Sequence, residues 1–245
     1  MKVAILGGTG GMGRALARQM AARGDTIFLL GHEPDDLERS ARDLEVRARQ
    51  RRVGTAHCDL EQPDTFAPAL ERAAMALDGL DCVVITAALF ATQEDLELDR
   101  AFRRRMLQAN FVHTVDFCEL ARRRLLASGG GTLVAFSSVA GDRGRKPIVM
   151  YGAAKAGLSA YLEGLDHKYK AEGLHTICVK PGFVRTAMTS GMKPPPFAGE
   201  PEQVATRVLA AIDSGRPVVY APAIWRWVMF VIRRLPRFVM RRIGF

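Results

Sequence analysis

A run of glycines close to the start of the chain constrains the fold most. Apolar residues 3–6 are followed by a glycine-rich turn, and a helical pattern begins near residue 12. Within the turn, Gly7, Gly11 and Gly13 have the spacing G-x3-G-x-G. Glycine permits a tight turn, a close approach to a bound group and close packing of the next helix. The order of strand, turn and helix therefore predicts a dinucleotide pyrophosphate site at a helix N-terminus.

The rest of the chain alternates short apolar runs with longer amphipathic segments. This alternation is typical of β-α units around a mostly parallel sheet. We expect strands near residues 2–6, 26–31, 53–58, 81–87, 131–137, 174–180 and 217–220. We expect helices near residues 12–23, 35–49, 63–78, 95–127, 150–172 and 201–214. The predicted fold is α/β, a Rossmann-like doubly wound sheet of seven strands with helices on both faces, over residues 1–220.

Two segments depart from this regular pattern. The helix near 95–127 is long for one element, and we expect a bend or a break around Asn110. It carries arginine triplets at 103–105 and 122–124, which we interpret as solvated faces. Residues 192–199 contain three consecutive prolines, which fix φ and lack a donor, so a loop is expected there.

Composition limits the class of protein. A length of 245 residues suits one large α/β domain. No basic, apolar and cleavable leader pattern precedes the first strand, so we expect a cytoplasmic protein. The four cysteines (Cys58, Cys82, Cys118, Cys178) have neither CxxC spacing nor a histidine pair nearby. They predict reduced, mostly buried thiols and no metal site.

A serine, a tyrosine and a lysine after the fifth expected strand have a spacing that suits proton transfer. Ser138 stands at the end of that strand, and Tyr151 and Lys155 are four residues apart, on one face of a helix. An amine beside a phenol lowers the pKa of the phenol, as a general acid requires. Ser138 can donate a hydrogen bond to an oxygen on which charge develops. Together with the glycine turn, these residues predict proton transfer coupled to hydride transfer from a nicotinamide.

The choice of cofactor depends on the end of the second strand. Folds selective for NAD usually place an acid there, whereas this chain has His32. His32, assisted by Arg14, suits a 2′-phosphate, so NADP(H) is favoured over NAD(H); a loop residue without contacts is the alternative for His32. Asp59, followed by Leu60, suits the adenine amino group, and a helix N-cap is its alternative role.

Over residues 1–220 the chain resembles the short-chain dehydrogenase/reductase family. The resemblance rests on Gly7, Gly11, Gly13, Asp59, Asn110, Ser138, Tyr151, Lys155 and the segment 181–186. It implies that Tyr151 is the acid/base, that Lys155 also binds the nicotinamide ribose and that Ser138 orients the carbonyl. It further implies that Asn110 holds the helix bend and a proton-relay water.

The resemblance also implies the cofactor contacts. The segment 181–186 would close over the nicotinamide, with Val184 and Thr186 at its carboxamide. The expected contacts are Gly7, Thr9, Gly11, Met12, Gly13, His32, Asp59, Leu60, Ala87, Tyr151, Lys155, Pro181, Gly182, Val184 and Thr186. One departure concerns residues 85–88, which are Ile-Thr-Ala-Ala where the family usually has Asn-Asn-Ala-Gly. Thr86 can replace one of the hydrogen bonds lost there.

Residues 221–245 form a basic amphipathic C-terminal segment. They carry six arginines and no acid, out of a net charge of +9 for the chain. Their longest apolar run, 227–232, is far below the roughly 20 residues of a spanning helix. Basic residues interleaved with aromatics favour contact with a membrane surface. The alternative is docking on the protein's own core or on a second subunit; a homo-oligomer is left open, and nucleic acid is not an expected partner.

The C-terminal segment extends the resemblance to one bacterial branch of the family. Residues 137–143, 151–158, 180–186, 220–222 and 225–229 are similar to reductases of decaprenylphosphoryl 2-keto-pentose. This similarity implies a lipophilic or polyprenyl-phosphate-linked keto-sugar substrate, reduced by an enzyme peripheral on the inner face of the membrane. The alternatives are a soluble carbonyl reductase with a self-packed tail and a non-catalytic dinucleotide-binding sensor.

Overall fold

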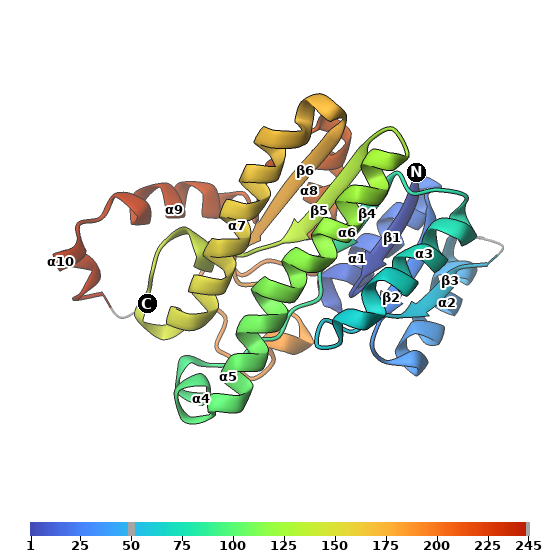
Figure 1. Ribbon diagram of the computed structural model, residues 1–245. Helices are drawn as coiled ribbons and strands as arrows, with labels where there is room; N and C mark the ends of the chain where they lie inside the picture. Colours follow the sequence, from blue (N-terminus) through green and yellow to red (C-terminus); the bar gives the residue numbers. More distant parts are fainter. Residues whose placement is uncertain (49–51, 244–245) are drawn as a thin grey trace.

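The computed structural model describes residues 1–48 and 52–243 and contains a parallel sheet flanked by helices (Figure 1). Among the described residues the sheet has seven strands in the order β3-β2-β1-β4-β5-β6-β7. The strands are β1 (Lys2–Leu6), β2 (Thr26–Gly31), β3 (Gly54–His57), β4 (Cys82–Ile85), β5 (Gly131–Phe136), β6 (Leu174–Pro181) and β7 (Val218–Ala221). The order reverses beside β1, as in a doubly wound Rossmann-like fold. The predicted fold class is confirmed.

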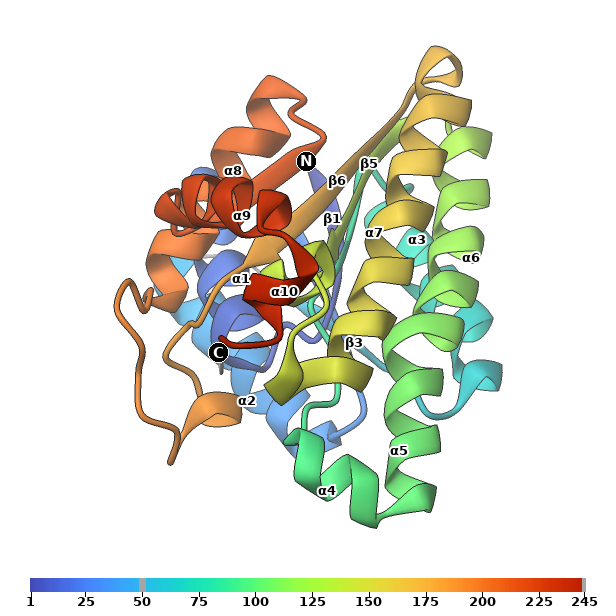
Figure 2. The same ribbon diagram turned by 90° about the vertical axis from the view of Figure 1, so that its left-hand side faces the viewer.

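Helices cover both faces of the sheet (Figure 2). One face carries α1 (Gly11–Arg23), α2 (Pro34–Ala48) and α8 (Pro201–Ser214), and the other carries α3 (Phe66–Leu77), α6 (Thr114–Ala127) and α7 (Val149–Tyr169). Because both faces are covered, the strands are apolar almost throughout. Within β1, Ala4 and Leu6 belong to one core cluster, whereas Val3 and Ile5 belong to the other. The last residue of the helix expected near 35–49 lies outside the described residues.

The four cysteines lie in this core as free, buried thiols. Burial raises the pKa of Cys58 and of Cys82 to about 12, so both thiols keep their protons at neutral pH. In the described part of the chain, no cluster of histidine, cysteine or acidic side chains could hold a metal ion.

The helix expected near 95–127 is divided into several elements. These are α4 (Gln93–Leu98), α5 (Arg100–Leu107), a π-helical turn (Gln108–His113) and α6. The π-helical turn contains Asn110, so the regular α-helix is interrupted at the expected position although the chain stays helical. At the start of α6, the Thr114 hydroxyl donates to the Ala109 carbonyl at 2.7 Å. A second division at Asp99 was not expected. The Asp99 carboxylate accepts from the Phe102 amide at 2.9 Å and so begins a new helix.

Short 3₁₀ helices complete the chain at residues Pro63–Thr65, Val139–Asp142, Lys146–Ile148, Lys170–Glu172 and Ala187–Thr189. The helix expected near 63–78 therefore begins as a 3₁₀ turn and continues as α3. The proline-rich residues 192–199 form a loop, as expected.

The C-terminal segment forms α9 (Ile224–Arg234) and α10 (Arg237–Met240), which extend to one side of the sheet (Figures 1 and 2). One face of α9 is docked on the protein, since Trp225, Met229 and Ile232 are buried in a cluster with Val139. For this face of α9, the alternative that the C-terminal segment docks on the protein's own core is therefore the correct one. No helix in the described residues is long and apolar enough to cross a membrane.

Candidate active site

The glycine turn after β1 is built as its spacing predicts. Gly7 has a φ of +88°, and a Cβ there would lie 2.6 Å from the Ala87 amide nitrogen. A Cβ on Gly13 would lie 2.2 Å from the Gly7 carbonyl oxygen, so α1 could not pack so closely on the turn. A Cβ on Gly11 would lie 2.7 Å from Thr186 Cγ2. Gly7 thus allows the turn itself, Gly13 allows α1 to pack closely on that turn, and Gly11 allows Thr186 to approach it.

The N-terminus of α1 suits an anion. Its N-cap residue, Gly10, has no side chain to accept from the first helical amides. These amides and the positive end of the helix dipole face the glycine turn. The residues therefore fit a dinucleotide pyrophosphate at this position.

A groove of about 300 Å³ runs along this turn and the ends of the neighbouring strands. Of the expected cofactor contacts, those that line it are Gly7, Thr9, Gly11, Met12, Gly13, His32, Asp59, Leu60, Ala87 and Thr186. Its lining also includes Glu61, Leu89 and Met188, which the sequence reasoning missed. These three follow expected contacts in the chain by one or two residues. Their place in the chain, one or two residues beyond an expected contact, is the signal that could have found them.

At the end of the groove where adenosine is expected, Arg14, His32 and Asp59 contact other groups of the protein. Arg14 donates from Nη2 to the Thr9 carbonyl at 2.5 Å, while His32 Nε2 lies 3.5 Å from Glu33 Oε1. The His32 side chain is 66% exposed at the rim of the groove. Asp59 Oδ1 accepts from the Glu61 amide at 2.9 Å. Asp59 thus closes a local turn, whereas Gln62 is the N-cap of the 3₁₀ helix that follows, so the helix N-cap alternative for Asp59 is wrong. Its contact with the adenine amino group stays a prediction.

Ser138, Tyr151 and Lys155 are brought together where β5 meets α7. Ser138 lies close enough to the Tyr151 hydroxyl to lower its pKa slightly. Ser138 Oγ itself donates to the Pro181 carbonyl at 3.4 Å and accepts from the Ala140 amide at 3.1 Å. Lys155 is 2% exposed, and its Nζ donates to the Phe136 carbonyl at 2.9 Å and lies 5.8 Å from the centroid of the Tyr151 ring. The ring of Phe90 packs edge-on against Tyr151, with centroids 5.3 Å apart. The tyrosine, the serine and the lysine thus share one largely apolar environment.

The pKa values correct one expectation. Burial raises the pKa of Tyr151 to about 12, against a smaller lowering by the neighbouring Ser138 side chain. Burial also lowers the pKa of Lys155 to about 8. The expectation that Lys155 lowers the pKa of Tyr151 is therefore wrong for the protein as it stands. The physical reason is that loss of water around both groups outweighs their mutual interaction.

Asn110 ties the loop after β4 to the π-helical turn. It is fully buried, its Oδ1 accepts from the Leu89 amide at 2.8 Å, and its Nδ2 donates to the Leu89 carbonyl at 2.6 Å. The π-helical turn places the helix irregularity at Asn110, whereas the roles of Asn110 in holding a bend and a proton-relay water stay predictions. Thr86 Oγ1 donates to the Gly7 carbonyl at 3.0 Å, so it ties the atypical loop to the glycine turn. That this bond replaces one of the family's usual bonds stays a prediction.

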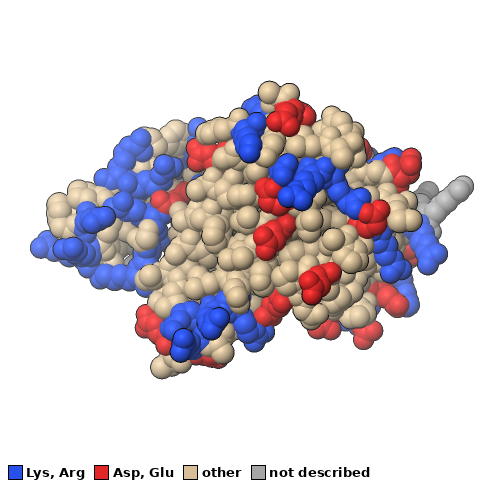
Figure 3. Space-filling model, viewed as in Figure 1, with Lys and Arg blue, Asp and Glu red and all other residues tan. Residues whose placement is uncertain are grey.

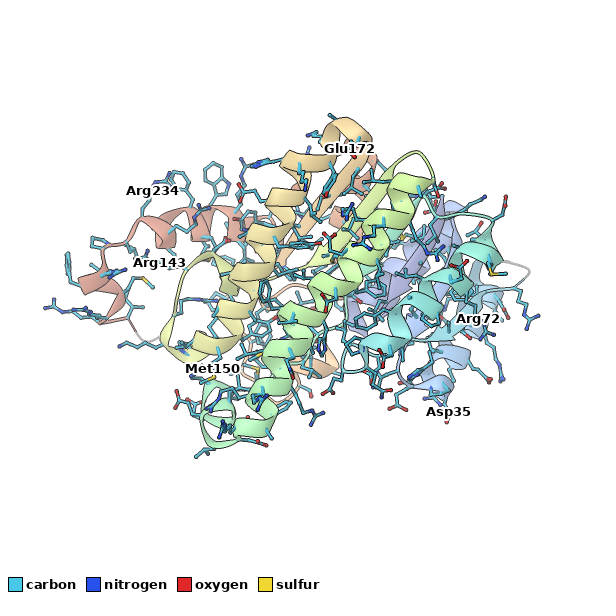
Figure 4. The ribbon with its side chains drawn as sticks, viewed as in Figure 1. Asp35, Arg72, Arg143, Met150, Glu172 and Arg234 are labelled. Carbon is cyan, nitrogen blue, oxygen red and sulfur yellow. The ribbon has the colours of Figure 1, made fainter. Side chains whose placement is uncertain are left out.

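Two polar side chains that the sequence reasoning missed position α7. Gln93 is buried, and its Oε1 accepts from the amide of Met150, labelled at the start of α7 in Figure 4, at 3.2 Å. Ser137 Oγ donates to the Lys155 carbonyl at 2.9 Å. These bonds anchor the helix on both sides of Tyr151. Neither residue has a recognisable sequence signal, because their partners are distant in the chain.

The segment after β6 crosses the glycine turn. Thr186 contributes to the groove, whereas Pro181, Gly182 and Val184 are absent from its described lining. Val184 is 3% exposed and pairs as an isolated bridge with Gly199. In this arrangement only the end of the segment reaches the groove.

Comparisons with known proteins agree with this geometry. The family model described as short chain dehydrogenase matches residues 1–195. An uncharacterized oxidoreductase of Mycobacterium tuberculosis H37Rv is 33% identical over 240 residues, covering 98% of this chain and 96% of that protein. Carbonyl reductase family member 4 of Xenopus tropicalis is 28% identical over 224 residues, covering 86% and 90%.

The fold has close structural neighbours as well. A short chain dehydrogenase from Shigella flexneri 2a strain 301, solved in complex with NADP, has a TM-score of 0.79 and 24% identity, covering 89% of this chain and 95% of that one. The family match over most of the chain and the full-length relative agree with the seven-stranded sheet. The chain belongs to the short-chain dehydrogenase/reductase family of oxidoreductases.

Proposed function

We propose that this protein reduces a keto group on a lipophilic or polyprenyl-phosphate-linked sugar, with NADP(H) preferred over NAD(H), or catalyses the reverse oxidation. The observation that carries the proposal is the grouping of Ser138, Tyr151 and buried Lys155 where β5 meets α7, together with the groove along the glycine turn. The protein would work in the cytoplasm, peripheral on the inner face of the membrane.

The residues divide the chemistry between them. A bound nicotinamide supplies or accepts the hydride at the carbonyl carbon. Tyr151 gives its proton to the carbonyl oxygen as negative charge develops there, and Ser138 donates a hydrogen bond to the same oxygen. Lys155, with a pKa of about 8, is charged at neutral pH and stabilises the phenolate that remains. The carbonyl carbon thus gains a hydride and its oxygen a proton, and the Tyr151 phenolate regains a proton from solvent before the next turnover.

Apolar side chains around the site support a lipophilic substrate. Leu89 and Met188 line the groove, and Phe90 contacts Tyr151. Met188, Met192 and Phe197 are exposed large apolar residues on the loops after β6. The basic tail supports a phosphate-linked lipid, because it could hold the enzyme where such a substrate resides.

The preference for NADP(H) rests on His32. This histidine lines the groove where NAD-selective folds usually have an acid. The 2′-phosphate of NADP(H) would be accepted there by His32, with Arg14 turning from the Thr9 carbonyl to assist. An Asp at position 32 would repel the phosphate, so His32→Asp should lower the kcat/KM ratio of NADPH to NADH by about tenfold.

The deciding experiment compares two substrates with each cofactor. Initial rates of NADPH and NADH oxidation would be measured with a detergent-dispersed polyprenyl-phosphoryl 2-keto-pentose and with a soluble aromatic ketone. Turnover of the lipid-linked sugar alone supports the proposal. Turnover of the soluble ketone alone contradicts it, in favour of a second candidate, a soluble carbonyl reductase. That candidate is favoured by one observation, the docking of α9 on the core through Trp225 and Met229.

A further inference from the structure

A second, larger groove lies outside the active site, along the last strand of the described sheet. It has a volume of about 1120 Å³ and is bounded by α8, β7 and α9. Its lining includes five arginines: Arg207, Arg216, Arg226, Arg233 and Arg234. Figure 3 shows Lys and Arg side chains gathered around the C-terminal helices at the left of the molecule. The groove shares no lining residue with the active-site groove.

The arginines of this groove lie together without an acidic partner in the described part of the chain. Elsewhere, Arg23, Arg105 and Arg122 each form an ion pair with a carboxylate. Among the described residues, no groove arginine forms an ion pair, and no acid lines the groove. Several like charges held together without counterions favour an anionic ligand. Arginine in particular suits phosphate, because its planar donors match two phosphate oxygens at once.

The outer face of α9 is apolar beside these charges. Trp227 is 63% exposed, Phe230 48% and Val231 57%, although Trp225, Met229 and Ile232 on the inner face are buried. The inner face therefore anchors the helix, and the outer face has no partner within the described chain. An amphipathic surface of this kind, with arginines flanking aromatic and aliphatic side chains, suits the headgroup region of a bilayer.

Charge and ring geometry decide between the candidate occupants. A second copy of the chain would bring two sets of five arginines together, which is unfavourable. Single-stranded nucleic acid would need open aromatic faces for stacking. Here the Arg234 guanidinium covers the Phe230 ring at 3.5 Å from the centroid, and Trp227 packs against Phe230 at an interplanar angle of 67°. An anionic bilayer brings no further positive charge to the groove and needs no uncovered aromatic faces.

We propose that this groove binds phosphate headgroups of an anionic phospholipid membrane, with Trp227, Phe230 and Val231 entering the interface. The groove would account for the membrane contact of the proposed function. This proposal rests on that contact and not on the proposed reaction, because membrane binding needs no turnover. It assigns a headgroup site on α8, β7 and α9, distinct from the site of reduction.

The test uses the full-length protein and sedimentation with two kinds of vesicle. One contains phosphatidylglycerol and phosphatidylcholine, and the other phosphatidylcholine alone. The variant Arg216→Glu/Arg226→Glu reverses two exposed groove charges. The control Arg72→Glu/Arg104→Glu changes net charge equally on α3 and α5, which lie elsewhere on the surface. We expect the parent and the control to bind the anionic vesicles, and the groove variant to bind at least about tenfold more weakly.

Tryptophan fluorescence supplies a second readout. Trp225 is buried and Trp227 exposed, so insertion should shift the emission of Trp227 to shorter wavelength. The shift should be absent in Trp227→Phe. Equal loss of binding in both charge variants, or none in either, would overturn the proposal. So would tighter binding to single-stranded DNA than to anionic vesicles. Binding without reductase activity would leave this inference intact and count against the proposed reaction.

Discussion

The indole of Trp225, in the first turn of α9, lies directly against the backbone of Gly182. A Cβ added at Gly182 would be 2.1 Å from the indole Nε1, which also donates to the Phe197 carbonyl at 3.3 Å. Gly182 in turn donates from its amide to the Ala221 carbonyl at 2.9 Å. The C-terminal helix and the segment that leads to Thr186 in the cofactor groove are therefore packed as one unit.

Gly182→Ala should lower the free energy of unfolding by about 1–3 kcal/mol, because the new methyl group overpacks the indole. Trp225→Ala should lower it by roughly 3–5 kcal/mol through loss of buried contacts. In the Trp225→Ala background the alanine at 182 should have almost no further effect. Urea unfolding of the four proteins of this double-mutant cycle measures the coupling. Additive effects would mean that the two residues do not interact as described.

Gly13→Ala should impair both stability and cofactor binding, because its Cβ would lie 2.2 Å from the fixed Gly7 carbonyl oxygen. The displacement of α1 should weaken NADPH binding by about tenfold or more, equivalent to about 1.4 kcal/mol. The matched control is Gly10→Ala, whose Cβ would be 3.8 Å from the same oxygen. Titration of NADPH by fluorescence compares the two. Similar losses in both variants would contradict a packing role specific to Gly13.

Tyr151→Phe should bind NADPH as tightly as the parent and lose about 10²–10⁴-fold in kcat. The substitution removes the hydroxyl beside Ser138 and leaves the ring against Phe90. Cofactor titration and initial rates, measured on the same preparation, separate binding from turnover. A rate comparable to the parent would remove Tyr151 from the proposed proton transfer.

The pKa of Lys155 predicts a pH dependence of stability. In the folded protein this pKa is about 8, below the ordinary lysine value of 10.5, so between these values the unfolded chain holds the proton more tightly. The contribution of Lys155 to the free energy of unfolding should therefore increase as pH rises from about 8 to 10.5, by about 1.4 kcal/mol for each pKa unit. Buried thiols with raised pKa values oppose this trend in the whole protein.

The effect of Lys155 is isolated by comparison with Lys155→Met, which keeps a similar volume. The difference in unfolding free energy between parent and variant, measured by urea titration from pH 7 to 10.5, should move in favour of the parent as pH rises. Parallel curves would show that the lysine is not titrating abnormally in the fold.

Local patterns in the chain were sufficient for the fold and for the central residues of the site. The glycine spacing requires a close turn, and the structure shows three near contacts that only glycine allows. The four-residue spacing of Tyr151 and Lys155 places both on one face of α7 without any tertiary information. The division of the long helix at Asn110 followed the family resemblance and the excessive length of the segment.

Contacts between distant residues could not be read from the chain. Gln93 accepts a hydrogen bond from the amide of Met150, which is more than fifty residues away in the chain. No periodicity in the sequence relates the two residues. The pKa of Tyr151 depends on how completely the fold removes water, which reversed the expected direction. The tail is apolar on two sides, and only packing shows that Met229 faces the core while Trp227 faces outward.

The sequence by itself determined the parallel α/β sheet, the glycine turn and the residues for proton transfer, because each depends on spacing within one or two adjacent elements. The tertiary structure alone decided the groove lining, the burial that sets the pKa values of Tyr151 and Lys155, and the gathering of Arg207 and Arg216 with the arginines of α9. These features depend on which residues, distant in the chain, pack together and exclude water. Such contacts are set by the packing of the whole chain and not by any local pattern.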